Sequence, residues 1–376
     1  MNVRRLAFVD NLRILLAGLV VLHHAGQPYG PTGGHWPVSH AEHAAILGPF
    51  FHVNASFFMG LFFLISGYFL PGAGAGAVAV AVAGKGTAAF LKDRFLRLGV
   101  PILFFVFGLF PVLAWAGTPH ASLGSYWARS ILVQHEFEFG HLWFVAHLLL
   151  YGVLYSLWVR WRGTVHDLPE RPFPGPRLIF LYILALGLVS AVLRLHYPVD
   201  RWVFWGIPLE PAHLPQYLSL FLLGILAQRH RWFERIPDRQ GASCLALGLG
   251  AMLFRFSCTL LHWQFFGRPL RTGCINWMGI FWNLWEAALC AGLCIGLLWC
   301  FRRGLNHQNA FARLLSANTY GIYLVHVPIL VVCQMMLGRT TLGPLALTGL
   351  SALVAWSISA LASMALRRIP GARRVL

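Results

Sequence analysis

The stretch LAFVDNLRILLAGLVVLHHA, residues 6–25, decides the fold, because it combines a long apolar run with charged and imidazole side chains. A helix needs roughly 20 mostly apolar residues to cross a hydrocarbon core about 30 Å thick. Arg4, Arg5, Asp10 and Arg13 crowd its start, and no small-residue cleavage site follows. The stretch is therefore predicted to be a first membrane anchor and not a cleaved signal peptide.

The composition of the whole chain agrees with a lipid environment. Of its 376 residues, 58% are hydrophobic and only 11% are charged, whereas a soluble domain averages about 25% charged residues. The net charge of +17 sits in short clusters between apolar runs, a pattern that argues against nucleic acid as a partner. The seven cysteines form no CxxC pair, so neither a metal site nor redox chemistry is indicated.

The apolar runs predict an all-α, polytopic membrane bundle of about ten transmembrane helices. We find no internal repeat, linker or second domain, so residues 1–376 are predicted to form a single transmembrane domain. The Gly/Ala-rich segment 72–90 is expected to be an interfacial helix or loop and not an eleventh span. Pro211 and Pro215 suggest an irregular or re-entrant start to a short sixth span. The predicted spans are 6–25, 48–70, 98–117, 141–159, 178–195, 213–228, 241–261, 275–301, 314–337 and 341–366.

The distribution of Lys and Arg predicts the orientation of the bundle. With the N-terminus inside, 22 of the 29 basic residues fall on the inner side, six fall outside, and Arg255 falls within a span. The first outer loop, 26–47, carries none. Positive charge accumulates on the cytoplasmic side of membrane proteins. Both termini are therefore predicted to be cytoplasmic, with the chain crossing the inner (plasma) membrane several times.

Charged residues within a span are costly and default to functional candidates. In the first span, Arg13 and His24 lie only about 20° apart around a helix, and Asp10 lies within about 60° of Arg13. His23 is about 80° away from Arg13. Asp10, Arg13 and His24 thus form a polar stripe roughly 20 Å long, which favours a cavity or channel lining. The alternative is that Arg13 caps the cytoplasmic helix end and His24 marks the outer boundary.

The second span adds polar residues at both of its ends. His52 and Asn54 lie near the outer end, and Ser66 and Gly67 lie near the inner end. A Ser-Gly pair is common where membrane helices pack closely. It is also suitable where backbone approaches a ligand.

Later spans contain further polar candidates, each with a structural alternative. Trp143 is expected near the membrane interface, the level that Trp favours. His326 lies in the middle of the ninth span, where a structural role and a pore-lining role are both open. Arg255 and Glu286 fall at compatible depths and are predicted to form a structural ion pair.

The inner loop LKDRFLRLGVP, residues 91–101, places Arg94 and Arg97 one helical turn apart. Two arginines on one face can bind an anion in a bidentate manner at the membrane surface. Taken by itself, however, the pair is better explained by the ordinary accumulation of positive charge on the inner side.

Taken in order, these phrases resemble the membrane acyltransferase-3 family, which includes bacterial polysaccharide O-acetyltransferases and glucan succinyltransferases. The match rests on the Arg-x10-His spacing of Arg13 and His24 and on the Arg-x2-Arg of Arg94 and Arg97 before Pro101. It also rests on FFLISGYF (62–69), HLWFVAHLLLY (141–151), LPQYLSLFLLGILAQRHRWFERIP (214–237) and NTYGIYLVHVPIL (318–330).

The resemblance implies transfer of an acyl group, acetyl or succinyl, from cytoplasmic acyl-CoA to a hydroxyl or amine of a carbohydrate or another cell-envelope acceptor. Acetyl-CoA is the favoured donor, and no metal is implied. His24 would be the general base or acyl relay. Helix phase favours His24 over the adjacent His23.

The resemblance also suggests roles for the other candidates. Arg13, with Asp10, would line the same cavity and contact the donor or the developing oxyanion. Arg94 and Arg97 would hold CoA phosphates, with Ser66 and Gly67 in the same donor site. The residues expected to line the substrate path are His23, His52, Trp143, Tyr323 and His326.

Two other classes of function compete with an acyltransferase. A small-molecule or ion transporter would also carry Arg, His and Glu within its spans, but no inverted repeat is visible. A non-catalytic membrane sensor on the same scaffold is disfavoured because His24, Arg13 and the arginine pair are all present.

Overall fold

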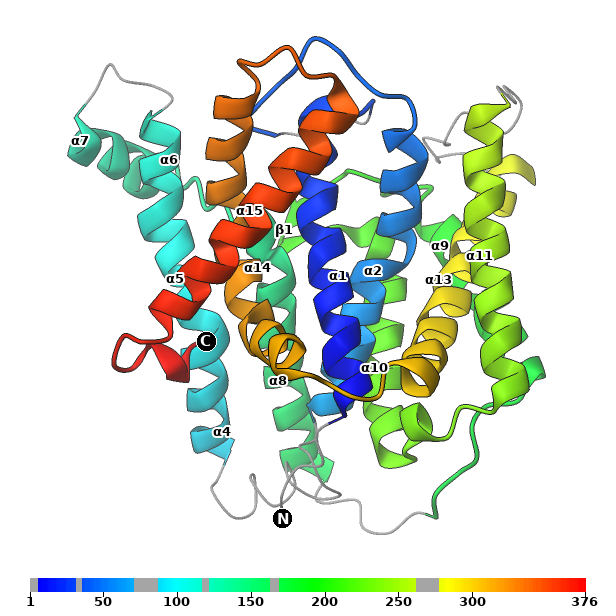
Figure 1. Ribbon diagram of the computed structural model, residues 1–376. Helices are drawn as coiled ribbons and strands as arrows, with labels where there is room; N and C mark the ends of the chain where they lie inside the picture. The colour runs from blue at the N-terminus through cyan, green and yellow to red at the C-terminus, as the bar shows by residue number, and fades with distance from the viewer. Residues whose placement is uncertain (1–5, 32–35, 71–86, 117–121, 163–168, 262–276) are drawn as a thin grey trace. The chain divides into compact units, whose positions relative to one another are not determined.

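The protein is an all-α chain, as the sequence predicts. The computed structural model describes residues 6–31, 36–70, 87–116, 122–162, 169–261 and 277–376 (Figure 1). Two short strands, β1 and β2, pair with each other. The elements are α1 (Ala7–Gly26), η1 (Gln27–Tyr29), α2 (Leu47–Phe69), α4 (Thr87–Arg94), η3 (Phe95–Gly99), α5 (Val100–Phe104), η4 (Phe105–Leu109), α6 (Phe110–Ala116), α7 (Leu123–Trp127), η5 (Ala128–Val133), η6 (Gly140–Leu142), α8 (Trp143–Arg162), α9 (Pro176–Leu193), β1 (Val203–Phe204), β2 (Pro208–Leu209), η7 (Pro211–His213), α10 (Leu214–Arg229), η8 (Trp232–Glu234), α11 (Asp238–Leu260), α13 (Trp277–Gly304), α14 (Ala310–Leu337), α15 (Pro344–Leu366) and η9 (Ala372–Arg374).

Nine helical stretches in the described part of the chain are long and apolar enough to cross a membrane. They coincide with nine of the ten predicted spans and make the chain a multi-pass membrane protein. The predicted sixth span, 213–228, corresponds to α10, which has only 16 residues and is shorter than the roughly 20 needed to cross the core. In segment 72–90, residues 72–86 lie outside the described residues, and residues 87–90 begin α4.

The chain divides into two compact units, and each is described by itself. The first contains α1, α2, α9, α10, α11, α13, α14 and most of α15; the second contains α4 to α8 with residues 204–209 and 363–376. In the first unit α1 packs against α2, α13 and α14, while α13 also packs against α9 and α11. That the whole chain is a single domain stays a prediction.

Two π-helical turns interrupt the span formed by residues 88–115 in the second unit. The turn η3 ends two residues before Pro101, and η4 ends two residues before Pro111. A proline ring collides with the carbonyl four residues earlier and donates no hydrogen bond. The wider π turn accommodates this carbonyl in both cases.

Glycines let pairs of helices in the first unit approach to backbone contact. A Cβ atom on Gly67 of α2 would collide with the Phe221 carbonyl of α10. On α11, a Cβ atom on Gly248 would lie 2.8 Å from the Leu293 backbone nitrogen of α13. Small residues at crossings are a main source of packing between helices in lipid. The structure therefore gives Gly67 a packing role.

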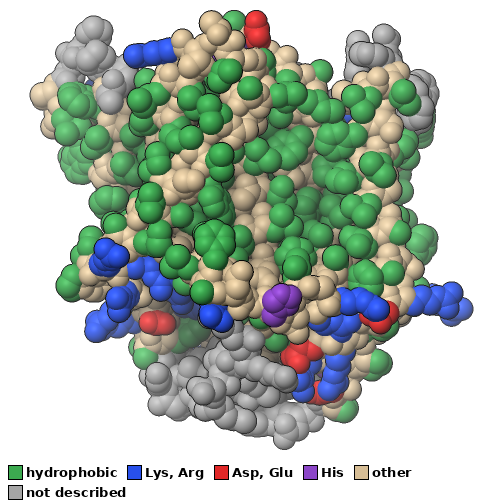
Figure 2. All heavy atoms as spheres, viewed as in Figure 1, with side chains coloured by type: hydrophobic (Ala, Val, Ile, Leu, Met, Phe, Trp, Pro, Cys, Tyr) green, Lys and Arg blue, Asp and Glu red, His purple; other side chains and the backbone are tan. Residues whose placement is uncertain are grey.

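One end of the first unit carries a polar layer. On the face shown in Figure 2, hydrophobic side chains cover the middle of α1 and α11, and Lys and Arg gather where α11 begins and α13 ends. Arg303 pairs with Asp238 at 2.7 Å, and Arg302 donates to the Ile236 carbonyl at 2.6 Å. These contacts attach the loop before α11 to the end of α13.

The glycine packing leads to a matched prediction on α11. Gly248→Ala should lower the free energy of unfolding by about 1–3 kcal/mol, because the added methyl group forces α13 away. Gly250 lies two residues further on and is exposed, and a Cβ atom there would meet no atom of the described residues within 4 Å. Gly250→Ala should leave stability unchanged or slightly raised. Thermal unfolding in detergent measures both, and equal Tm values for the two variants would contradict the packing role.

Candidate functional site

The polar residues of α1 occupy its two ends. Arg13 Nη1 lies 3.7 Å from Asp10 Oδ1, and the guanidinium lies 4.7 Å from the ring centroid of Phe69, the last residue of α2. At the other end of α1, the ring centroid of His23 lies 4.9 Å from that of Phe51, in the first turns of α2. The two helices therefore run antiparallel, and Arg13 and His24 are separated by about 16 Å along α1.

The His24 ring packs between two rings from other segments of the first unit. Trp36 stacks on it, with centroids 5.2 Å apart and planes at 28°. His326 of α14 lies on another side, at a centroid distance of 5.3 Å. The structure thus brings two sequence-predicted residues, His24 and His326, into one cluster, although they are about 300 residues apart.

A backbone carbonyl determines the tautomer of His326. Its Nδ1 lies 2.7 Å from the carbonyl oxygen of Tyr323. A carbonyl only accepts hydrogen bonds, so Nδ1 carries the proton, and Nε2 of the neutral ring presents a lone pair. His326 is completely buried, so this orientation is held by packing as well.

Gln334 of α14 connects the Trp36 side chain to the last turn of α1, next to His24. Its Oε1 accepts from Trp36 Nε1 at 2.7 Å, and its Nε2 donates to the Ala25 carbonyl at 3.1 Å and to the His24 carbonyl at 3.3 Å. The last carbonyls of a helix lack partners within the helix. One buried amide therefore satisfies the end of α1 and holds the indole that stacks on His24.

His23 and His24 face different neighbours. The His23 ring contacts Phe51 and Phe58 of α2, at centroid distances of 4.9 and 5.2 Å. His24 instead faces Trp36 and His326. Which of the two histidines reacts stays a prediction, but in the described ring contacts His24, unlike His23, packs against an imidazole from another helix.

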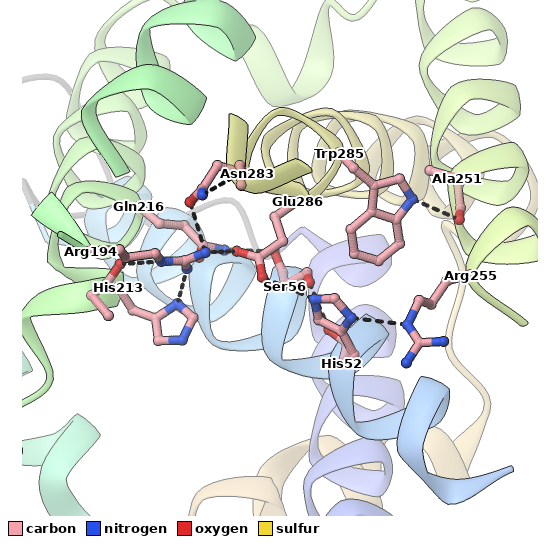
Figure 3. A network of polar contacts seen from close by, with 12 residues as sticks. His52, Ser56, Arg194, His213, Gln216, Ala251, Arg255, Asn283, Trp285 and Glu286 are labelled. Carbon is pink, nitrogen blue, oxygen red and sulfur yellow. Dashed lines mark hydrogen bonds and ion pairs between the residues drawn. The ribbon is translucent and has the colours of Figure 1, made fainter. Parts of the chain in front are cut away.

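A second polar cluster lies inside the same unit, and Figure 3 shows its contacts. Glu286 of α13 pairs with Arg194 at 2.6 Å through Oε2 and with His52 Nε2 at 3.0 Å through Oε1. His52 Nδ1 lies 3.1 Å from Arg255 Nε. On the far side, Arg194 contacts His213 Nδ1 at 3.3 Å. The residues come from α2, the end of α9, η7, α11 and α13 and form one chain, which we call the Glu286 network.

The arginines set the proton positions in this network. An arginine side chain can only donate hydrogen bonds. His52 Nδ1 must therefore accept from Arg255, which leaves the proton on Nε2, where it is donated to Glu286. By the same reasoning His213 accepts from Arg194 and carries its proton on Nε2. In both imidazoles, therefore, Nδ1 is the nitrogen that accepts from an arginine.

The predicted direct ion pair between Arg255 and Glu286 is wrong. His52 stands between them, and the cation that pairs with Glu286 is Arg194. The sequence places Arg194 at the outer end of the fifth predicted span, 178–195, but the structure turns it inward from the end of α9 to 3% exposure. The sequence signal for Arg194 was a basic residue at the end of an apolar run. The same pattern equally fits a residue at the start of an outer loop.

The space beside Glu286 is small. Gln216 of α10 lines it and donates to the Ser56 carbonyl at 2.7 Å. The remaining cavity, lined in part by Ser190, Arg194 and Cys290, has a volume of about 10 Å³. One water molecule needs about that much room. The network is therefore a set of satisfied partners and not a substrate chamber.

The predicted donor-site residues fall in different units. Arg94 ends α4 and lies 5.3 Å from the Phe90 ring centroid, while Arg97 is exposed on η3; both belong to the second unit. Trp143, which begins α8, is in that unit too. Ser66 is half-buried on α2 in the first unit. Their predicted roles stay predictions.

In the described residues no group of three or more His, Cys, Asp or Glu could hold a metal ion.

The Glu286 network predicts a strong dependence of stability on its carboxylate. Glu286→Gln should lower the free energy of unfolding by about 3–5 kcal/mol, because it leaves buried Arg194 without a counter-charge. The exposed carboxylate Glu42 offers the control, and Glu42→Gln should leave Tm unchanged. The double variant Arg194→Met, Glu286→Leu should recover part of the loss. Thermal unfolding in detergent decides, and a Glu286→Gln protein as stable as the wild type would refute the ion pair.

Comparison with known proteins gives one match. The acyltransferase 3 family, described as an acyltransferase domain, matches residues 6–364, which is nearly the whole chain. No curated protein and no solved structure matches. The matched region includes α1 with His24, the α14 residues around His326 and the whole Glu286 network. The chain therefore belongs to the acyltransferase 3 family and is a membrane acyltransferase.

Proposed function

We propose that this chain transfers an acyl group, acetyl in the first instance, from cytoplasmic acyl-CoA to a hydroxyl or amine of a carbohydrate or another cell-envelope acceptor. It would do so as a multi-pass protein of the inner (plasma) membrane with both termini in the cytoplasm. The observation that carries the proposal is the packing of His24 between Trp36 and His326 in a chain of the acyltransferase 3 family.

His24 would act as the general base. It takes the proton of the acceptor hydroxyl as the oxygen attacks the thioester carbonyl carbon, so a C–O bond forms and the carbonyl electrons move to oxygen. The C–S bond then breaks, and His24 returns the proton to the CoA sulfur. Histidine suits both steps because its unperturbed pKa is about 6.5. The stacked indole of Trp36 and the packed ring of His326 would hold the imidazole orientation.

The remaining candidates would serve the two substrates. Arg94 and Arg97 would bind CoA phosphates, since guanidinium groups match phosphate in a bidentate manner. Arg13, beside Asp10, would contact the donor in the first unit. Ser66 stays a candidate donor contact, whereas Gly67 already packs against α10. His23, His52, Trp143 and Tyr323 stay candidates along the path, although His52 is engaged in the Glu286 network.

His24→Ala should abolish acyl transfer, because no other described group takes the same position between Trp36 and His326. The protein should still insert and keep its Tm within a few degrees. Release of free CoA thiol and transfer of radiolabel from acetyl-CoA to an envelope fraction measure activity. His23→Ala removes the adjacent imidazole and should retain transfer at a reduced rate, because His23 is a candidate contact along the path and not the base. Activity in His24→Ala with loss in His23→Ala would move the base by one residue, and full activity in both would refute a histidine base.

Arg94→Ala combined with Arg97→Ala should weaken acyl-CoA binding by tenfold or more, because charge-assisted contacts contribute roughly 1.5–3 kcal/mol each. Lys92→Ala, on the same helix, removes a charge of the same sign and should leave the Kd unchanged. Binding of acetyl-CoA to the purified protein in detergent is measured by calorimetry. An unchanged Kd in the double variant would leave the pair with a role in topology alone.

A separate experiment identifies the acceptor. Mass spectrometry of envelope glycans and small metabolites, with and without the gene, would reveal it by its lost acyl mass.

A further inference from the structure

Helix α2 carries polar side chains on more than one face. His52 and Ser56, one turn apart, belong to the face that meets α10 and α13 in the Glu286 network. Asn54 lies between them in sequence and about 200° from His52 around the helix. It therefore points away from the network.

Asn54 is buried, at 3% exposure, and its amide nitrogen Nδ2 has no hydrogen-bond partner among the described residues. Every other buried amide side chain in the described part of the chain does donate. Those side chains are Gln216, Asn283, Asn318 and Gln334. A buried donor without an acceptor costs stability, and in a native protein it calls for an explanation.

The contacts of its helical neighbours place Asn54 opposite α1. Phe51, three residues before, and Phe58, four residues after, share its face of α2. The rings of both contact His23, at 4.9 and 5.2 Å between centroids. Asn54 therefore lies at the seam between α1 and α2, at the level of the two adjacent histidines.

A second polar atom at the same seam also lacks a partner. His23 Nδ1 is buried and has no hydrogen-bond partner among the described residues. Phe50, Phe51 and Phe58 surround much of the ring. Two unsatisfied polar atoms in a seam lined by phenylalanines indicate a place that a polar group of a bound molecule completes.

We propose that Asn54 Nδ2 donates a hydrogen bond to the carbonyl oxygen of the acyl thioester and stabilises the oxyanion that develops there. This proposal rests on the proposed function. When the acceptor oxygen attacks, the C=O electron pair moves onto this oxygen, and it returns to the carbon as the C–S bond breaks and the CoA sulfur leaves. A donor fixed in a dry apolar seam stabilises that charge without reorganising. Without substrate, the Asn54 Nδ2 donor has no hydrogen-bond partner among the described residues, and the lost stability is the cost of holding it in place.

Asn54→Leu tests the proposal, because leucine has a similar shape and lacks the donor. We expect kcat to fall about 100-fold or more, with the KM for acetyl-CoA unchanged. Tm should rise, because a buried unsatisfied donor is replaced by an apolar group. A donor with only a structural role would give a lower Tm and no selective loss of kcat.

Asn318→Leu provides the matched control for stability. Asn318 is equally buried, but its Nδ2 donates to the Leu314 carbonyl at 2.8 Å. The same substitution there removes a satisfied bond and should lower Tm, the opposite sign to that expected for Asn54→Leu. If Asn54→Leu does not accumulate in the membrane, Asn54→Ala takes its place, and its kcat and KM are read in the same way.

The outcomes separate this proposal from the proposed function. Wild-type kcat in Asn54→Leu, or a lower Tm together with lower activity, overturns the oxyanion role. So does an effect confined to the KM of the acceptor. If in these cases His24→Ala is still inactive, the proposed function stands without Asn54. If the wild-type protein releases no CoA and transfers no acyl group, the proposed function fails, and the role of Asn54 fails with it.

Discussion

The Glu286 carboxylate is the group on which the first unit depends most directly. Within the hydrocarbon core, water does not solvate a buried charge, so its hydrogen-bond and ionic partners must come from the protein. Glu286 finds Arg194 and His52, and these in turn bind His213 and Arg255. A single ionic chain thereby joins five elements, and its geometry leaves them little freedom to slide.

Helix α2 connects the Glu286 network to the other helices of the unit. Gly67 brings it to backbone contact with α10, and His52 joins it to α13. Its remaining face packs against α1 through Phe51 and Phe58. The position of α2 thus determines how α1 presents His23 and His24. On the opposite side, Gln334 of α14 holds the end of α1 and the indole of Trp36. The two contacts together orient the histidine that the proposed chemistry uses.

The sequence was a good guide where one helix decides the answer. Hydropathy located nine spans, and helical phase separated His24 from His23 before their different neighbours were visible. The sequence was misleading where contacts between two segments had to be predicted. The direct pair of Arg255 with Glu286 is wrong because depth along a helix says nothing about which helix stands between two residues. Trp36 and Gln334 escaped notice because an indole in a loop and an amide in a span are common, and only their contacts make them distinctive.

The sequence by itself determined that this is an all-α membrane chain, which residues its spans contain, and which polar side chains interrupt them. These properties follow from the cost of polar groups in lipid and from the 3.6-residue period of the helix, both of which act locally. Only the tertiary structure decided that Arg194 is the counter-charge of Glu286, that His326 packs against His24, and that Asn54 alone among the buried amides of the described residues donates to nothing. Those facts depend on how helices distant in sequence pack together, and packing is decided by glycine crossings and shared hydrogen bonds that no single helix encodes.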